Sequence, residues 1–382
     1  YNVLAYLDIG PTLANMYEQM FAQMGSAMMP DGMSGMMDMA ITMYRSYPPM
    51  AMGLTLLDGR SLTMDYAVGS FNISEMEAAM GLDPMTIPAP VSLDFAQYIP
   101  ADAPIVIHST GAGESTKRSL QVMAYMVDAF KEMAFMFSDM GSGSGMDDIP
   151  QFVRDITGND VRAFINLSFA GMTGLNLEKD VLDHINGNSA FYLRFLLSDV
   201  LGYTLDGAII IENAEPDAMQ KIFDGLVGAL EQYDANFELE GEAVSLPGVI
   251  RGFFPAGMPE EMMAAPELDF MFGLDDNLFA FGTRQAVEFS LDASGDSLAD
   301  DPAYSEAAQY FLDDTVMVWY LGFAPIAEAL NVVAASDTVD SFTANDLEMV
   351  STALSIFSSA SITASLDENY SGVARFVLTL AE

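Results

Sequence analysis

VLAYLDIGPTLANM, residues 3–16, returns in altered form near the other end of the chain as MVWYLGFAPIAEAL, residues 317–330. The two segments align without gaps, with matches of Tyr6 to Tyr320, Leu7 to Leu321 and Pro11 to Pro325. Each has the pattern of a strand that leads into a helix with proline in its first turn, where the missing N–H of proline costs nothing. Self-similarity of this kind indicates a repeated architecture.

Two further pairs of segments extend the repeat. MAMGLTLLDGRSLTMDYAVG (50–69) and SASITASLDENYSGVARFVL (359–378) each predict a strand, a turn that begins Leu-Asp, and a second strand. Apolar residues alternate in the first of these with the period of a half-buried antiparallel hairpin. YIPADAPIVIHSTG (98–111) aligns in turn with YFLDDTVMVWYLGF (310–323). We therefore predict an α+β fold of repeated modules, in which antiparallel sheet is covered by helices.

The repeat also divides the chain. Residues 1–90 have the pattern of the closing half of a module, whereas residues 91–382 have that of a complete α+β unit with an internal repeat. We expect a longer precursor to supply the missing opening half, and an N-terminal cap is the alternative. The leader of an exported protein would then lie upstream of Tyr1.

The local patterns predict the individual elements. Helices are expected at residues 12–26, 34–46, 116–139, 177–185, 215–232, 303–311, 325–335 and 343–357. Strands are expected at residues 2–8, 51–58, 61–69, 104–109, 161–169, 189–197, 204–212, 268–273, 277–282, 315–321, 359–366 and 372–380.

The composition restricts the compartment and the partners. The chain carries 55 Asp and Glu against 13 Lys and Arg, a net charge of −42, and 51% of its residues are hydrophobic. This apolar content is enough for a folded protein, whereas the charge disfavours nucleic acid and anionic membrane surfaces. No cysteine occurs, which excludes disulfides and thiolate chemistry. The longest apolar stretch, residues 120–137, contains charged residues, so no transmembrane segment is predicted.

Residues 277–330 carry a family resemblance. NLFAFGTRQAVEFSLDASGDSLADDPAYSEAAQYFLDDTVMVWYLGFAPIAEAL contains a strand that ends in Gly, a short helix, a Ser-Leu-Ala helix start, and a strand with Tyr before the next helix. This order, with YIPADAPIVIHST at 98–110, resembles the bacterial domain-of-unknown-function family three-three-five-two. The resemblance covers residues 91–382, with 1–90 as a partial copy. It implies an extracytoplasmic protein of the bacterial envelope or exterior, without assigned catalytic residues.

Few residues in the sequence suggest catalysis. His108 and His184 are the two histidines, and they form no recognised spacing. No G-x-S-x-G motif occurs. GAGEST (111–116) lacks the third glycine of a dinucleotide-binding turn, and we interpret it as a tight turn capped by Ser115 or Thr116. We therefore predict that the protein is not an enzyme and has no catalytic or cofactor-binding residues.

One acidic loop is a candidate for calcium. DASGDSLADD (292–301) concentrates carboxylates around a glycine, and its candidate ligands are Asp292, Asp296, Asp300 and Asp301. Calcium prefers such oxygen-rich loops, although the EF-hand spacing is absent. Turn and helix-cap carboxylates are the alternative interpretation.

Methionine is enriched around MMPDGMSGMMDM, residues 28–39. The methionines that form two apolar stripes of a predicted helical hairpin are Met16, Met20, Met24, Met28, Met36, Met37 and Met43. Their helical spacing favours a core packed on the sheet of residues 51–69. The flexible thioether side chain also suits a groove for a partner or lipid. Copper(I) held by thioethers is the third interpretation.

Together these patterns predict a non-enzymatic bacterial envelope or extracellular protein that acts through its surface in assembly or adhesion. Its expected partner is protein, through self-association or envelope assembly, and not nucleic acid. The alternative is a carrier of hydrophobic ligands such as lipid, in a cavity lined by Met and Phe. No cofactor is expected, and calcium is the one ion that the loops suggest.

Overall fold

A computed structural model describes residues 3–24, 41, 44–45, 47–70, 77–78, 80–139, 155–198, 202–233, 235–247, 269–293, 295–336, 340–368 and 371–381. Within these ranges the strands are β1 (Val3–Leu7), β2 (Met50–Leu57), β3 (Ser61–Val68), β4 (Ile105–Thr110), β5 (Asn188–Ser198), β6 (Gly202–Glu212), β7 (Glu238–Glu240), β8 (Ala243–Leu246), β9 (Phe270–Leu274), β10 (Leu278–Thr283), β11 (Thr315–Gly322), β12 (Phe357–Leu366) and β13 (Gly372–Leu380).

The helices in the same ranges are α1 (Gly10–Met24), α4 (Ala112–Asp139), α6 (Gly158–Thr173), α7 (Pro216–Gln232), α9 (Arg284–Asp292), α10 (Pro302–Ala308), α11 (Phe323–Ala334) and α12 (Ser341–Leu354). Shorter helical turns are η2 (Leu93–Tyr98), η4 (Leu177–Leu182) and η7 (Leu298–Asp300). No helix in the described part of the chain is both long enough and apolar enough to cross a membrane.

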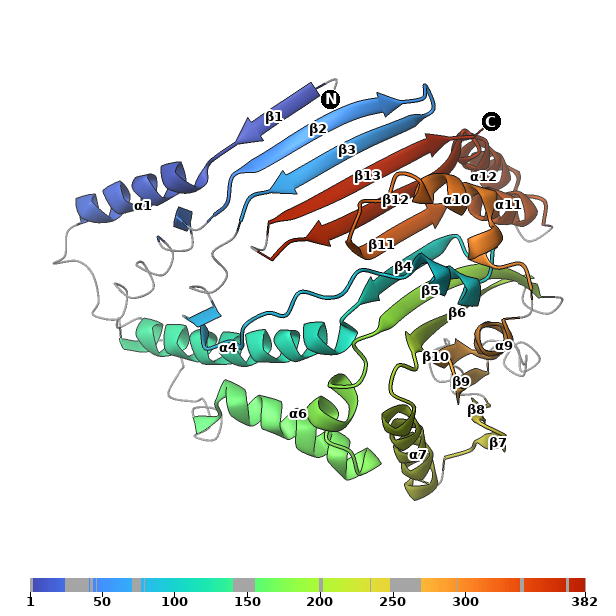
Figure 1. The fold of residues 1–382 in the computed structure, drawn as a ribbon, viewed down its shortest axis with the longest axis horizontal. Coiled ribbons are helices and arrows are strands. Elements are labelled where there is room, and N and C mark those ends of the chain that lie inside the picture. The colour runs from blue at the N-terminus through green and yellow to red at the C-terminus, as the bar shows by residue number, and fades with distance from the viewer. Residues whose placement is uncertain are drawn as a thin grey trace.

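The described strands form one sheet of 13 strands in the order β1-β2-β3-β13-β12-β11-β4-β5-β6-β10-β9-β8-β7 (Figure 1). Every neighbouring pair in it is antiparallel. The predicted α+β class, with antiparallel sheet and covering helices, is confirmed. Residues 1–90 supply β1, β2 and β3 to this sheet, so the sheet continues across the predicted domain boundary.

The two copies of the predicted repeat meet inside the sheet. The strands β1-β2-β3 and β11-β12-β13 form two meanders that adjoin at the antiparallel pair of β3 and β13. Their registers agree, since Leu7, Met50 and Val68 stand side by side in one meander as Leu321, Ala360 and Leu378 do in the other. A local two-fold relation therefore links the meanders, and its centre falls where Asp65 faces Arg375.

An ion pair occupies that centre. The Nε of Arg375 lies 2.6 Å from Oδ1 of Asp65, and its Nη2 lies 2.9 Å from Oδ2. Asp65 is buried, and Nη1 of Arg375 also donates to the carbonyl of Tyr310 at 3.2 Å. This two-pronged geometry is the strongest form of an arginine–carboxylate contact, so it fixes how β3 and β13 align.

The predicted alignment of the two hairpins is wrong by one residue. Sequence matching placed Met50 with Ser359, because a Leu-Asp pair begins both turns. The strand registers instead match Met50 with Ala360. The reason is the turn length. The first turn spans residues 58–60 and the second spans 367–371, so the longer turn, with its Leu-Asp pair, begins one residue earlier relative to the centre of its hairpin.

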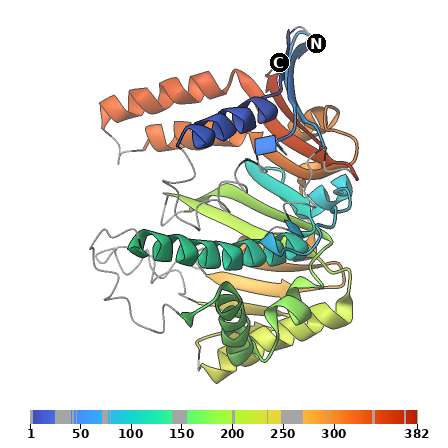
Figure 2. The same ribbon diagram turned by 90° about the vertical axis from the view of Figure 1, so that its left-hand side faces the viewer.

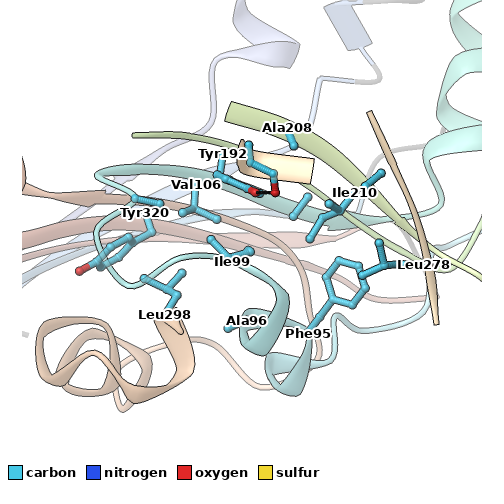
Figure 3. Close-up of a cluster of buried hydrophobic side chains, with 14 of the residues drawn as sticks. Phe95, Ala96, Ile99, Val106, Tyr192, Ala208, Ile210, Leu278, Leu298 and Tyr320 are labelled. Atoms are coloured by element: carbon cyan, nitrogen blue, oxygen red, sulfur yellow. Dashed lines mark hydrogen bonds between the residues drawn. The ribbon is translucent and has the colours of Figure 1, made fainter. Parts of the chain in front are cut away.

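The sheet has two unlike faces. The core face carries Val106, Tyr192 and Ile210 and is covered by η2, α9, η7 and α10 (Figure 3). Tyr192 ties α9 to this face, because its hydroxyl donates to the carbonyl of Ala286 at 2.7 Å and lies 2.8 Å from Oγ of Ser290. The long helices α1, α4, α6, α7, α11 and α12 stand on the opposite side, which we call the helix face (Figure 2).

A strand predicted at residues 161–169 is wrong, because these residues lie within α6. The apolar side chains alternate there, but Phe164 and Leu167 are exposed and no strand face is buried. A capping box begins the helix, with Thr157 and Asp160 each accepting a backbone N–H of the other. The helix cap, rather than the alternation of apolar residues, therefore determines the secondary structure of this segment.

The predicted cap of the GAGEST segment is also wrong. Helix α4 begins at Ala112, directly after Gly111, whose φ of 70° suits glycine. Ser115 and Thr116 lie inside the helix, and the hydroxyl of Thr116 donates to the carbonyl of Ala112 at 2.8 Å. Gly113 serves close packing, because a Cβ there would lie 1.8 Å from the carbonyl oxygen of Leu182.

Candidate functional site

One row of side chains crosses the helix face from edge to edge of the sheet. The strand registers place these residues opposite one another, in sheet order: Val3, Leu54, Met64, Phe376, Ile362, Trp319, Ile107, Phe191, Ile209, Phe281, Phe272, Val244 and Leu239. Directly opposite residues share one face of a sheet and touch their neighbours. Every member is apolar, and at the usual strand spacing the row is roughly 60 Å long. We call it the apolar row.

Much of the apolar row is open to solvent. Exposed fractions of 37–57% are found for Val3, Met64, Ile362, Trp319, Ile209, Phe281 and Leu239. Phe272 and Val244 are buried, because α7 covers that end of the sheet and the ring of Phe223 packs edge-on against Phe272 at 5.5 Å. Soluble monomers rarely leave a long contiguous apolar surface uncovered, so the row has the character of a binding surface.

Paired helices stand on the same side as the row (Figure 2). In one pair, the hydroxyl of Ser351 in α12 donates to the carbonyl of Ala327 in α11 at 2.9 Å. In the other, the N–H of Gly158 at the start of α6 donates to Oδ1 of Asp128 in α4 at 2.8 Å. Large apolar side chains that these helices leave exposed are Met126, Phe130, Phe164, Leu167, Phe342 and Met349. The helices on this side therefore add further exposed apolar surface.

Trp319 lies at the middle of the apolar row. It is the single tryptophan of the chain, and 48% of it is exposed. Its indole Nε1 donates to Sδ of Met317, two residues away on the same face, at 3.2 Å. Tryptophan combines a large apolar surface with one polar group, a combination common in binding surfaces.

The methionines fall partly within the described residues. Met16 and Met20 in α1 are exposed, so the core interpretation is wrong for these two positions. The middle of α1 is held instead by aromatic stacking, with the ring centres of Tyr17 and Tyr44 4.8 Å apart. Outside the described side chains lie Met24, Met28, Met36, Met37 and Met43.

A buried polar chain runs through His108 on the core face. Its Nε2 lies 3.1 Å from Oδ1 of Asn188, whose Nδ2 donates to Oε2 of Glu212 at 2.8 Å. The ring of Phe95 stacks on the imidazole at 5.4 Å. The backbone N–H of Ser92 donates to the same Oδ1 of Asn188 at 2.8 Å. These contacts hold η2 against β4 and β5, and the amide and carboxylate partners gave no signal in the sequence.

The stability of the fold is expected to fall in acid through His108. Burial lowers the pKa of His108 below its ordinary value of 6.5, against smaller opposing effects of Asn188 and Glu212. The unfolded chain therefore takes up this proton at higher pH than the folded chain, so the free energy of unfolding decreases as pH falls below 6.5. Urea midpoints of wild type and His108→Gln, measured from about pH 7 to pH 5, should diverge, with the wild type losing more. Parallel curves for the two proteins would contradict this expectation.

His184 has a simpler environment. Its Nδ1 lies 2.7 Å from Oε2 of Glu215, just before α7, and both side chains reach solvent. The structure does not bring His184 together with His108, which lies on the core face of β4.

The four calcium candidates do not converge. Asp301 caps α10 by accepting the N–H of Tyr304 at 3.0 Å, and it also accepts the hydroxyl of Tyr320 at 3.2 Å. Asp300 accepts the hydroxyl of Ser297 at 2.7 Å, whereas Asp292 and Asp296 are exposed. Across the described ranges, no three His, Cys, Asp or Glu side chains are placed to hold a metal ion. Capping accounts for Asp301.

A pocket of 350 Å³ at the start of α4 gathers basic residues that the sequence did not single out. Lys117, Arg118, Arg162 and Lys179 are among its lining side chains. Three of them have carboxylate partners: Lys117 lies 2.9 Å from Glu114, Arg118 lies 2.9 Å from Glu77, and Arg162 lies 2.5 Å from Glu178. The Arg162 guanidinium holds the pKa of Glu178 below its ordinary value. Because these charges are matched, the pocket offers little attraction to an anion.

Comparison with known protein families, with curated proteins and with solved structures finds no match for this chain. The family resemblance noted in the sequence therefore stays a prediction. Function has to be argued from the surface itself.

Proposed function

We propose that this chain is a non-enzymatic bacterial envelope or extracellular protein that works through its surface, and that the apolar row is the binding surface. The single observation that carries the proposal is the exposure of seven row members by 37–57%, on the face of the sheet that lies opposite the main buried core. The extracytoplasmic compartment is supported by the lack of cysteine and by the family resemblance.

The chemistry of the surface defines the partner. Trp319, Phe281 and Ile209 offer apolar contact, while the chain as a whole carries a charge of −42. Repulsion from an anionic partner, including a second copy of this chain, acts over long range but is screened by salt, so the contact patch itself is apolar and uncharged. A protein partner of this kind, including another envelope component, fits assembly or adhesion best, because seven members of the row are exposed rather than enclosed in a cavity.

Binding is expected to change the fluorescence of Trp319. Contact with an apolar partner removes water from the indole, so the emission should move to shorter wavelength. Because the chain has no other tryptophan, the signal reports on the middle of the row alone. The measurement is an emission spectrum across a protein concentration series, read together with the mass from sedimentation. A shift that rises with mass supports assembly through the row.

A matched pair of variants locates the effect. Phe281→Glu puts a charge into the row, whereas Phe164→Glu puts the same charge on α6 outside the row. Both rings are already exposed, so neither change is expected to unfold the protein. Loss of the Trp319 shift in the first variant and its retention in the second supports the proposal. Equal behaviour of the two variants, or constant emission at every concentration, contradicts it.

A carrier of hydrophobic ligands is the second candidate. The observation that favours it is the length of the row, roughly 60 Å, which suits an extended acyl chain on the sheet. Neutral phosphatidylcholine vesicles are the probe, because anionic lipid would be repelled. A Trp319 shift with vesicles at constant monomer mass, blocked by Phe281→Glu, would assign the row to lipid rather than to protein.

A further inference from the structure

The two edges of the described sheet are built differently. Strand β7, Glu238–Glu240, has three residues and a glutamate at each end, so its edge is short and charged. Strand β1, Val3–Leu7, has five residues without charge, proline or glycine, and all five are exposed. Natural sheets protect their edges against pairing with other chains by short length, charge or proline. The β1 edge has none of these protections.

The local two-fold relation indicates which kind of strand can pair with the open edge of β1. Strand β1 occupies the place in its meander that β11 occupies in the other, with the same register to the next strand. The second side of β11 is filled by β4, which pairs with it in antiparallel fashion from Met317 opposite Ser109 to Leu321 opposite Ile105. Most residues of β11 are buried, whereas all residues of β1 are exposed.

We propose that the outer edge of β1 binds an extended strand of another polypeptide, in the register in which β4 pairs with β11. Transferred to β1, this register places the equivalent of Val106 opposite Tyr6 and the equivalent of Ile105 opposite Leu7. The bound strand adds a fourteenth strand to the described sheet. It gains the backbone hydrogen bonds that an edge leaves unmade.

The side chains of β1 define the partner strand. Leu4 and Tyr6 point to the core face, and Val3 and Leu7 point to the helix face, all of them exposed. A strand beside them is therefore uncharged and apolar on both faces where it meets Ala5, Tyr6 and Leu7, as β4 is at Ile105–Ile107. An acidic strand would meet the repulsion of a chain with a charge of −42. The partner is thus a strand that resembles β4 and belongs to another polypeptide. This inference does not depend on the function proposed for the apolar row.

The test uses the whole chain and a synthetic peptide of residues 103–111, with a short lysine tag for solubility. Hydrogen exchange read by mass spectrometry should show new protection of residues 3–7 on peptide addition and no change in β7. Two control peptides carry N-methyl groups on every second backbone amide. In one peptide the odd-numbered residues are methylated, and in the other the even-numbered residues are methylated. Because an edge pairs with every second amide of the peptide, one phase should abolish binding and the other should retain it.

A chain variant provides the second arm. Leu4→Lys together with Tyr6→Lys adds charge beside the edge at side chains already exposed, so folding is expected to be kept. Peptide affinity should fall at least about tenfold, the effect of edge charges that block strand addition. No protection of residues 3–7, or equal binding by both methylated peptides, overturns the proposal. A dimer in which β1 is protected before peptide is added also overturns it, because a second copy would then be the partner.

Discussion

Arg194→Met is expected to lower the free energy of unfolding by about 3–5 kcal/mol, the usual cost of leaving a buried charge without its partner. Nε of Arg194 lies 2.5 Å from Oδ2 of Asp206, which is 2% exposed. Methionine fills the space of the arginine stem but offers no donor, so the carboxylate keeps only the hydroxyl of Thr283. Urea denaturation at neutral pH measures the loss.

Two comparisons test the cause of that loss. Lys221→Met removes an exposed partner of Asp180, 2.6 Å away, and is expected to change the free energy of unfolding by no more than about 1 kcal/mol. Adding Asp206→Asn to Arg194→Met removes the buried charge and should recover about half of the loss or more. Failure of the double variant to recover would mean that Arg194 acts through packing, including its position 5.9 Å from the ring centre of Phe289.

Gly158→Ala is expected to destabilise the fold by about 2 kcal/mol or more, as overpacking against fixed backbone does. A Cβ on Gly158 would lie 1.8 Å from the carbonyl oxygen and 2.4 Å from the carbonyl carbon of Ala124. Neither atom can turn away as a side chain would, so α6 would have to move off α4. The movement would also lengthen the 2.8 Å hydrogen bond from Gly158 to Asp128.

The same helix contains the matched control. Gly171 lies inside α6, and an added Cβ there would meet nothing within 4 Å. Gly171→Ala is therefore expected to raise the free energy of unfolding by about 0.4–1 kcal/mol, because alanine restricts the unfolded chain and favours a helix. Opposite signs for one substitution at two sites of one helix would locate the constraint at the crossing of α4 and α6. A loss of stability at both sites would contradict this assignment, because the cost would then not be specific to the crossing.

The strands were predictable where their pattern was local and long. The hairpins at 50–69 and 359–378 were predicted within about two residues, because alternation and turn signals reinforce each other. Strands β7 and β8 were missed, since three and four residues are too few to show a period. The signal that would have identified α6 is the capping box of Thr157 and Asp160, which stands in the sequence.

The candidate site was not predictable in the same way. The apolar row depends on twelve strand registers, and several of them join segments that are far apart in the chain, such as Met64 and Phe376. Each member taken alone looks like an ordinary strand residue. The sequence drew attention to the methionines instead, because composition is visible without a register. His108 was visible too, but its partners Asn188 and Glu212 arrive from two other strands.

The pairing of Asp65 with Arg375 bears on the ancestry of the repeat. In a symmetric homodimer the position on the two-fold axis meets its own copy, so both sides must carry the same residue type. An aspartate there would face an aspartate, and an arginine would face an arginine, at a buried site where like charges are costly. Fusion of two gene copies into one polypeptide removes that restriction, because each half can then mutate alone. The salt bridge at the centre of β3 and β13 is thus a contact that a symmetric homodimer of one such half could not form.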